Sequence, residues 1–228
     1  MNHIQQRSTR AIASGAIAAL GVVIPVLASS ADQAGASSPA STVGTKIHVQ
    51  GDDNIFGAGL SQAPNGGTIP VKIALPKNTK TVTFSKVKGT VSYWSTTGES
   101  NGPDGQPSSD VTTNIDAAGG ISGLVDSTHN YFYMLGVFLD KTQPATPPPS
   151  LDFTNDYAFK KIKPELGQVF FIGDGLTGTG TGSTQKFIVP AGATALYLGF
   201  ADACGGTGGT SCWSDDIGSL KGQVHLAS

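Results

Sequence analysis

Three aspartates near the C-terminus have the residue type and the spacing to bind a cation. The segment from Ala201 to Ser219 reads ADACGGTGGTSCWSDDIGS, so Asp202 precedes a glycine-rich stretch and Asp215 and Asp216 follow it. Like charges gathered in one place repel, and a folded chain relieves the repulsion by turning them into water or by binding a cation. Calcium takes roughly six to eight oxygen ligands, from carboxylates and from carbonyls of irregular loops. We therefore interpret the three aspartates as calcium ligands, with loop carbonyls completing the shell.

The alternative interpretation is a solvated acidic surface. Neighbouring residues on a regular strand point to opposite faces, so Asp215 and Asp216 can both coordinate only if the strand has not yet begun there. The glycines between the aspartates favour the site, because glycine tolerates positive φ and lets a loop turn its carbonyls inward.

Two cysteines lie within the same segment. Cys204 and Cys212 are eight positions apart with glycines between them, a spacing that can close a short disulfide loop in an oxidising compartment. Free thiols or half of a metal site are the alternatives, but zinc would need two more ligands and the nearest histidine is His225. We favour the disulfide.

The N-terminus predicts export. MNHIQQRSTR is basic, AIASGAIAALGVVIPVLA is apolar, and small residues follow, which is the order of a secretory signal peptide. Cleavage is expected after Ala31 or after Ala36, and an uncleaved membrane anchor is the alternative. The predicted organisation is a signal peptide over 1–31, a flexible mature N-terminus over 32–44 and one domain over 45–228. The mature protein is then secreted or periplasmic, with no membrane segment.

Composition argues against charge-driven partners. Charged residues make up 13% of the 228-residue chain, the net charge is -2, and the lysines are scattered without a basic stripe, so we expect no nucleic-acid partner. The apolar fraction of 38% suffices for one modest core.

Hydrophobic residues repeat with period two, which is typical of strands. TKIHVQ, TVTFSKV and LKGQVHL alternate apolar and polar positions, and YFYMLGVFL, QVFFIG, KFIV and ALYLGF are continuously apolar, as expected of buried strands. Clusters rich in Gly, Pro, Asn and Asp separate them. Only DYAFKKIKPEL has room for a helical turn. This pattern predicts an all-β fold, a single β-sandwich or jelly roll.

Motifs for catalysis are absent from the sequence. There is no GxSxG, and His129 is the only histidine in a plausible loop. The GxGxxG formed by Gly173, Gly175 and Gly178 precedes another strand-like run and not a helix, so it predicts a long hairpin loop and not a dinucleotide site. We therefore expect no enzymatic activity.

The C-terminal motifs carry a resemblance to a known family. LYLGFAD, the glycine-containing loop and DDIGSLKGQVHL resemble the closing hairpin of the LecA-like bacterial galactophilic lectins, which are galactose-binding β-sandwiches. There an aspartate and two adjacent Asn/Asp residues bind calcium, and the calcium holds sugar hydroxyls. The resemblance implies these roles for Asp202 and for Asp215 and Asp216. KGTVSYW followed by GPDG resembles the family's other calcium-side loop, which implies a backbone carbonyl ligand from Tyr93. The wider likeness runs from Thr45 to Leu226 and extends to exported proteobacterial proteins that carry this domain.

This chain departs from the family pattern where the sugar is held. The family's sugar-contacting histidine and glutamine follow the GPxG turn, whereas here QPSSDVT supplies Gln106, Ser109 and Asp110 and no histidine. The loop between Asp202 and Asp215 is longer than in the lectins and carries the cysteine pair. Many such proteins end in a hydrophobic sorting tail, whereas this chain stops just after its last strand, so we expect it to be released.

We therefore expect a secreted, calcium-dependent carbohydrate-binding module, lectin-like but of unspecified sugar preference. The ligand contacts would come from the following residues: Asp202, Asp215, Asp104, Gln106 and Trp213. Trp213 would stack on a sugar ring, or would instead cover the disulfide or the core. The alternative function is an extracellular structural or matrix-associated β-sandwich, in which calcium only fastens the loop. The sequence is compatible with an oligomer.

Overall fold

The structure is a computed structural model that describes residues 44–94, 100–107, 113–127 and 130–228. The expected signal peptide, Ser109, Asp110 and His129 lie outside these ranges. Over the described residues the chain is built of strands and loops, with only two short 3-10 turns, η1 (Ile55–Gly57) and η2 (Cys204–Gly206), so the predicted all-β fold is confirmed. In the part of the chain described, no helix is long and apolar enough to cross a membrane.

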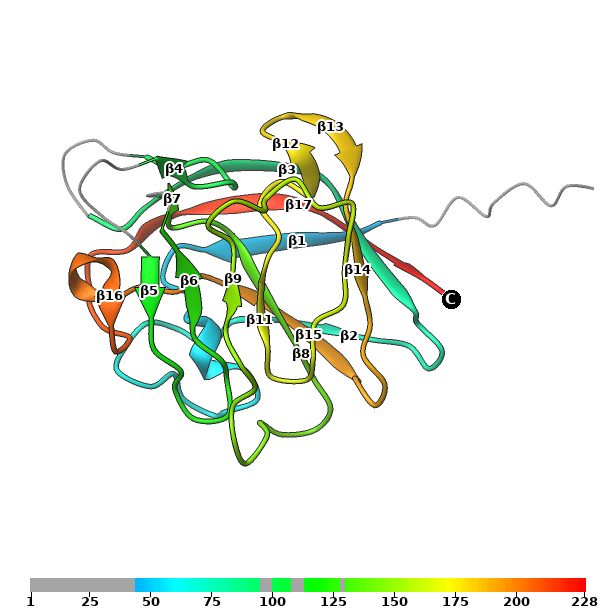
Figure 1. Ribbon diagram of the computed structural model, residues 1–228, viewed down its shortest axis with the longest axis horizontal. Helices are drawn as coiled ribbons and strands as arrows, with labels where there is room; N and C mark the ends of the chain where they lie inside the picture. The colour runs from blue at the N-terminus through cyan, green and yellow to red at the C-terminus, as the bar shows by residue number, and fades with distance from the viewer. Residues whose placement is uncertain (1–43, 95–99, 108–112, 128–129) are drawn as a thin grey trace, which may run out of the picture. The chain divides into compact units, whose positions relative to one another are not determined.

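Two main sheets form a sandwich (Figure 1). The first has the order β1 (Thr45–Gln50), β17 (Ile217–Ala227), β3 (Thr81–Ser92), β14 (Lys186–Ile188) and β10 (Lys161–Ile162). The second has the order β11 (Val169–Phe171), β8 (Leu135–Leu139), β15 (Ala195–Gly199) and β2 (Val71–Ala74). All neighbours are antiparallel except β10 and β14.

Smaller sheets lie beside the sandwich. One has the order β16 (Thr207–Gly208), β5 (Thr113–Ile115), β6 (Leu124–Asp126) and β9 (Leu151–Asp152). Two hairpin-like pairs complete the fold: β12 (Leu176–Gly178) with β13 (Thr181–Thr184), and β4 (Gln106–Pro107) with β7 (Asn130–Tyr131).

Aromatic side chains from both main sheets join in one core. Phe187 of β14 lies with its ring centroid 5.4 Å from that of Phe170 of β11, which belongs to the other sheet, and 5.5 Å from that of Phe84 of β3. All three rings are buried. Because aromatic rings bury large apolar areas, these contacts hold the two layers together.

Most of the predicted strands are found where the period-two pattern places them. In β1, Ile47 and Val49 are buried and their neighbours exposed, and β3 likewise buries Val82 and Phe84. The GxGxxG segment leads into the β12–β13 hairpin, so the prediction of a hairpin loop is confirmed.

Two local expectations are wrong. The run YFYMLGVFL is not one strand, because β7 ends at Tyr131, Phe132 adopts a φ of 54°, and β8 begins only at Leu135 in a different sheet. DYAFKKIKPEL contains the short strand β10 in place of a helical turn, because it pairs with β14.

The cross-sheet aromatic cluster generates a stability prediction. Replacing Phe187 with Ala should lower the free energy of unfolding by about 3–5 kcal/mol, because it leaves a cavity between the layers. Chemical denaturation measures the change. Ile69→Ala, at a partly exposed position, is the control and should change it by less than about 0.5 kcal/mol. Equal effects from the two substitutions would contradict the assigned core.

Candidate metal centre

One end of the sandwich brings strands of the two main sheets together. β15 ends at Gly199 and leads into Asp202, whereas β17 of the other sheet begins at Ile217, directly after Asp216. The chain after β1 fixes both ends: Phe200 N donates to Asp53 O over 2.7 Å, and Gly51 N donates to Gly218 O over 3.1 Å. Residues 200–216 therefore form a loop that bridges the two layers.

The predicted disulfide closes part of this loop. Cys204 and Cys212 are bonded, with Cα atoms 5.4 Å apart. Two further hydrogen bonds hold its base, from Ser211 N to Asp202 O over 3.0 Å and from Cys204 N to Ser211 Oγ over 3.1 Å. The loop returns to its starting point, which carries Asp215 back toward Asp202.

The three predicted aspartates converge. Asp202, Asp215 and Asp216 each offer a carboxylate oxygen, and these oxygens all lie within 4.8 Å of one another. The chain makes an irregular turn before β17 begins at Ile217, so the two adjacent aspartates are not forced to opposite faces. Asp215 and Asp216 can therefore both face the same ion, since the regular strand has not yet begun at either residue.

The members of the cluster differ in how their oxygens are satisfied. Asp202 is 2% exposed, and its Oδ1 accepts hydrogen bonds from the hydroxyl of Tyr131 and from Ala203 N, the latter over 2.8 Å. Asp216 is 7% exposed, yet neither of its oxygens has a hydrogen-bond partner among the described residues, and Oδ1 of Asp215 is also buried without one. Asp215 as a whole is partly exposed. The orphaned oxygens thus belong to the two residues that precede β17.

Full ionisation of this cluster is unfavourable without a cation. Two unit charges 4.8 Å apart repel by about 3 kcal/mol at an effective dielectric constant of about 20, and three carboxylates make three such pairs. Burial, and next the charge of Asp202, raise the pKa of Asp216 to about 9. Burial also raises the pKa of Asp202 to about 6, although its hydrogen bonds from Tyr131 and Ala203 oppose the shift. The site therefore holds a proton or takes up a cation.

Two residues near the acidic cluster were not predicted from the sequence. Tyr131 was counted only as part of a strand, yet its hydroxyl contacts Asp202. Asp52, in the turn after β1, adds a fourth negative charge that acts on Asp216. No local pattern could indicate either one, because both reach the site through strand pairing between distant segments.

Tyr93 lies beside the cluster. Ser92, the last residue of β3, pairs with Ile217, so the next residues in register are Tyr93 and Asp216. The ring of Tyr93 contacts that of Tyr131 edge to face, with centroids 4.5 Å apart. This position is consistent with the proposed carbonyl ligand, which stays a prediction.

Asp104 and Gln106 occupy the GPDG turn and the strand that follows it. The carboxylate of Asp104 accepts a hydrogen bond from Asp174 N over 2.8 Å, so its described contact is with the loop after β11. Gln106 pairs with Tyr131 in the β4–β7 ladder and so lies directly opposite the tyrosine that contacts Asp202. Of the two, Gln106 is the closer in connectivity to the acidic site.

The stacking role expected of Trp213 is wrong. Its side chain is 4% exposed, its Nε1 donates to Thr210 Oγ1 over 3.0 Å, and its ring packs against Gly66 and Gly67. A ring buried to this extent has no exposed face on which a sugar could stack. The structure has the other arrangement that the sequence allowed, with the indole as part of the core beneath the loop.

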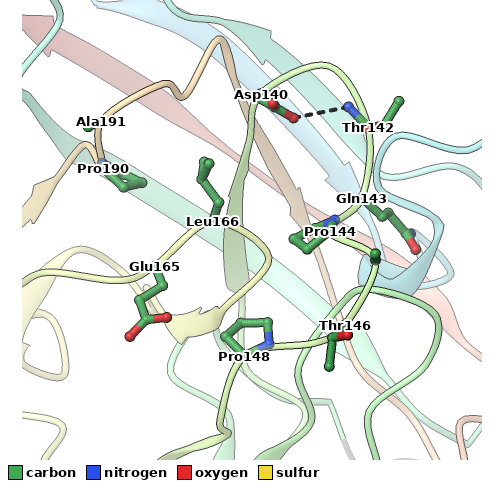
Figure 2. Close-up of a pocket in the computed structure, with 11 residues that line it drawn as sticks. Asp140, Thr142, Gln143, Pro144, Thr146, Pro148, Glu165, Leu166, Pro190 and Ala191 are labelled. Carbon is green, nitrogen blue, oxygen red and sulfur yellow. Dashed lines mark hydrogen bonds between the residues drawn. The ribbon is translucent and has the colours of Figure 1, made fainter.

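An open pocket of about 720 Å³ lies at the other end of β8 and β15. Figure 2 shows it between the loop that follows Asp140, the pair Glu165 and Leu166, and the turn at Pro190. The carboxylate of Asp140 is exposed, and hydrogen bonds from Thr142 N and Lys141 N lower its pKa. Unlike the acidic cluster, this pocket has no buried, unpartnered polar group among its lining residues.

In comparisons with models of protein families, with curated proteins and with solved structures, none matched this chain.

The raised pKa values predict how stability depends on pH without metal. Asp202 and Asp216 bind protons more tightly in the folded than in the unfolded chain, so raising the pH through about 6 and about 9 favours unfolding. In EDTA, the free energy of unfolding should fall by at least about 2 kcal/mol between about pH 5 and about pH 9. Denaturation series across this range measure it.

Asp216→Asn is the matched variant for this measurement. The amide keeps the shape of the side chain and removes its charge, so the decline above about pH 7 should largely disappear and the metal-free variant should be the more stable protein at about pH 9. An unchanged decline in the variant would mean that Asp216 does not carry the effect.

Proposed function

We propose that this chain is a secreted module that binds calcium at Asp202, Asp215 and Asp216 and uses the ion to bind carbohydrate. The observation that carries the proposal is the buried carboxylate of Asp216, which has no hydrogen bond on either oxygen and lies beside two further carboxylates. Such a group gains most from a cation, because an unpaired buried charge costs several kcal/mol.

The chemistry of the donors favours calcium over other metals. The cluster offers carboxylate oxygens only, whereas zinc prefers nitrogen and sulfur and the two nearby cysteines are bonded to each other. Calcium tolerates irregular oxygen shells, and the surrounding loop has many backbone carbonyls. When bound, calcium would supply charge and coordination positions for ligand oxygens.

Export is supported by the disulfide and by the N-terminal sequence. A disulfide persists in oxidising compartments, which are reached through a signal peptide of the kind that residues 1–31 resemble.

The carbohydrate part rests on the resemblance to the galactophilic lectins and on two surface features. Asp215 is the partly exposed member of the cluster, so an ion there remains within reach of a ligand from solvent. Trp94 follows Tyr93 and is 66% exposed, with its backbone held by hydrogen bonds between Trp94 and Ser92 Oγ. An exposed indole beside a polar site suits the apolar face of a sugar ring. We therefore assign to Trp94 the stacking role that Trp213 cannot fill.

The structural alternative has one observation in its favour. Asp202 and Asp216 are nearly inaccessible, which also suits an ion that serves only to fasten the loop. Calcium binding without carbohydrate binding would support this function and contradict the lectin-like one.

The cation is tested by thermal unfolding. Calcium at about 100 times its Kd should stabilise the protein by about 2.7 kcal/mol and raise Tm. Asp202→Asn should abolish the increase, because the amide still accepts the hydrogen bond from Ala203 N but lacks the charge. Asp140→Asn, an exposed aspartate at the other end of β8, should leave it intact. No increase in the unmodified protein would contradict the calcium site.

The carbohydrate is tested on a glycan array run with calcium and with EDTA. We expect glycan binding that the chelator removes, and a loss of affinity of roughly two- to tenfold in Trp94→Ala, since stacking adds about 0.5–1.5 kcal/mol. Calcium affinity should not change in that variant.

Leu60→Ala is the control, because Leu60 is also exposed and follows Gly59, where an added Cβ would lie 3.0 Å from Leu139 at the far end of β8. Glycan binding that persists in EDTA would contradict the calcium-dependent mechanism. Equal glycan binding by Trp94→Ala and by the unmodified protein would show that the indole does not contact the glycan.

A further inference from the structure

Tyr131 connects the acidic cluster with the GPDG segment. Its hydroxyl donates to Asp202 Oδ1 and lies 3.3 Å from Ala203 O. The side chain is buried, and its ring is packed edge to face against that of Tyr93. Burial, and next the charge of Asp202, raise the pKa of Tyr131 far above its ordinary value, so the hydroxyl keeps its proton and remains a donor.

We infer that Tyr131 is a positioning residue of the cation site and couples that site to the segment carrying Gln106. This inference rests on the cation binding proposed above. The hydroxyl and Ala203 N both engage Oδ1 of Asp202, so the carboxylate is held in one orientation before an ion arrives. Partners that orient a ligand in this way typically contribute about 10–100-fold to metal affinity.

The backbone of Tyr131 organises the other half of the site. Asn101 Nδ2 donates to Tyr131 O over 3.0 Å, and Gln106 pairs with Tyr131 between β4 and β7. Gly105 has a φ of 71°, and a Cβ there would lie 2.3 Å from Tyr131 O, so the turn can pass this close only with glycine. The segment from Asn101 to Pro107 is therefore assembled on Tyr131.

This arrangement has a direct consequence for ligand binding. An ion that fixes Asp202 also restricts the phenol bonded to it, and the phenol belongs to the residue whose backbone pairs with Gln106. Calcium would thus order the strand that carries a candidate ligand contact, in addition to supplying its own charge. A tyrosine that served only the core would fill space without this effect.

The decisive experiment compares two tyrosine-to-phenylalanine variants. Tyr131→Phe removes the hydroxyl on Asp202 and keeps the ring. Tyr133→Phe removes a hydroxyl that is equally buried but has no hydrogen-bond partner among the described residues. In calorimetric titration with calcium alone, the Kd should be at least about tenfold higher for Tyr131→Phe than for the unmodified protein. For Tyr133→Phe the Kd should change by less than about twofold.

The result that overturns the inference is equal calcium affinity in Tyr131→Phe and in the unmodified protein. In that case the cation site stands and its positioning by the phenol does not. Absence of calcium binding in the unmodified protein would overturn the inference together with the proposed function. Melting curves in EDTA confirm that each variant is folded before it is titrated.

Hydrogen exchange on the unmodified protein tests the coupling without any substitution. Adding calcium should slow amide exchange in the β4–β7 pair, at Gln106 and Tyr131, by at least about tenfold relative to EDTA, because opening of the pair becomes less frequent. The β10–β14 pair, which β3 separates from β17 in the first sheet, should exchange at the same rate in both conditions. Unchanged exchange in the β4–β7 pair would overturn the coupling.

Discussion

Uncompensated negative charge is the constraint on which this end of the molecule depends. Asp216 is removed from water, and the charges that raise its pKa come from Asp202, Asp215 and Asp52. Repulsion of about 3 kcal/mol per pair is a large fraction of the roughly 5–15 kcal/mol that stabilises an ordinary domain. In the metal-free protein a proton on the cluster relieves this repulsion, so the pH and the concentration of a cation both act on the stability of the whole domain.

The sandwich is what keeps the carboxylates from separating. Asp202 leaves a strand of one main sheet and Asp216 enters a strand of the other, so moving them apart would mean moving one layer against the other. The chain after β1 adds to the constraint. A Cβ on Gly51 would lie 2.6 Å from Ile217 O, so this close backbone approach depends on glycine. The disulfide fixes the remaining freedom of the loop by closing it over eight positions.

The accuracy of the sequence-based predictions follows the range of the interactions involved. Period two, turn residues and the spacing of the cysteines and aspartates are local properties, and they located most strands, the disulfide loop and the three aspartates. The division of YFYMLGVFL could not be read locally, because Phe132 turns the chain between two sheets whose partners are far away in sequence. The role of Tyr131 was not predicted and that of Trp213 was predicted wrongly for the same reason. The contacts of each side chain depend on segments that are distant in sequence and come together only in the folded chain. A tryptophan next to a polar loop looks the same in sequence whether its ring faces water or the core.

Other buried aspartates in the same chain show what Asp216 lacks. Asp53 is 4% exposed, and its two oxygens accept hydrogen bonds from Gln50 N over 2.7 Å and from Thr68 Oγ1 over 3.0 Å. Asp174 is as buried as Asp216, and its oxygens accept from Leu176 N and Gly180 N over 2.8 and 2.7 Å. Those carboxylates need no ion, because backbone and side-chain donors satisfy them. Among the described residues only Asp216 has both oxygens buried without a hydrogen bond. Since leaving a buried charge unpaired is costly and this fold satisfies both oxygens elsewhere, a partner that is not part of the chain is the simplest account of Asp216.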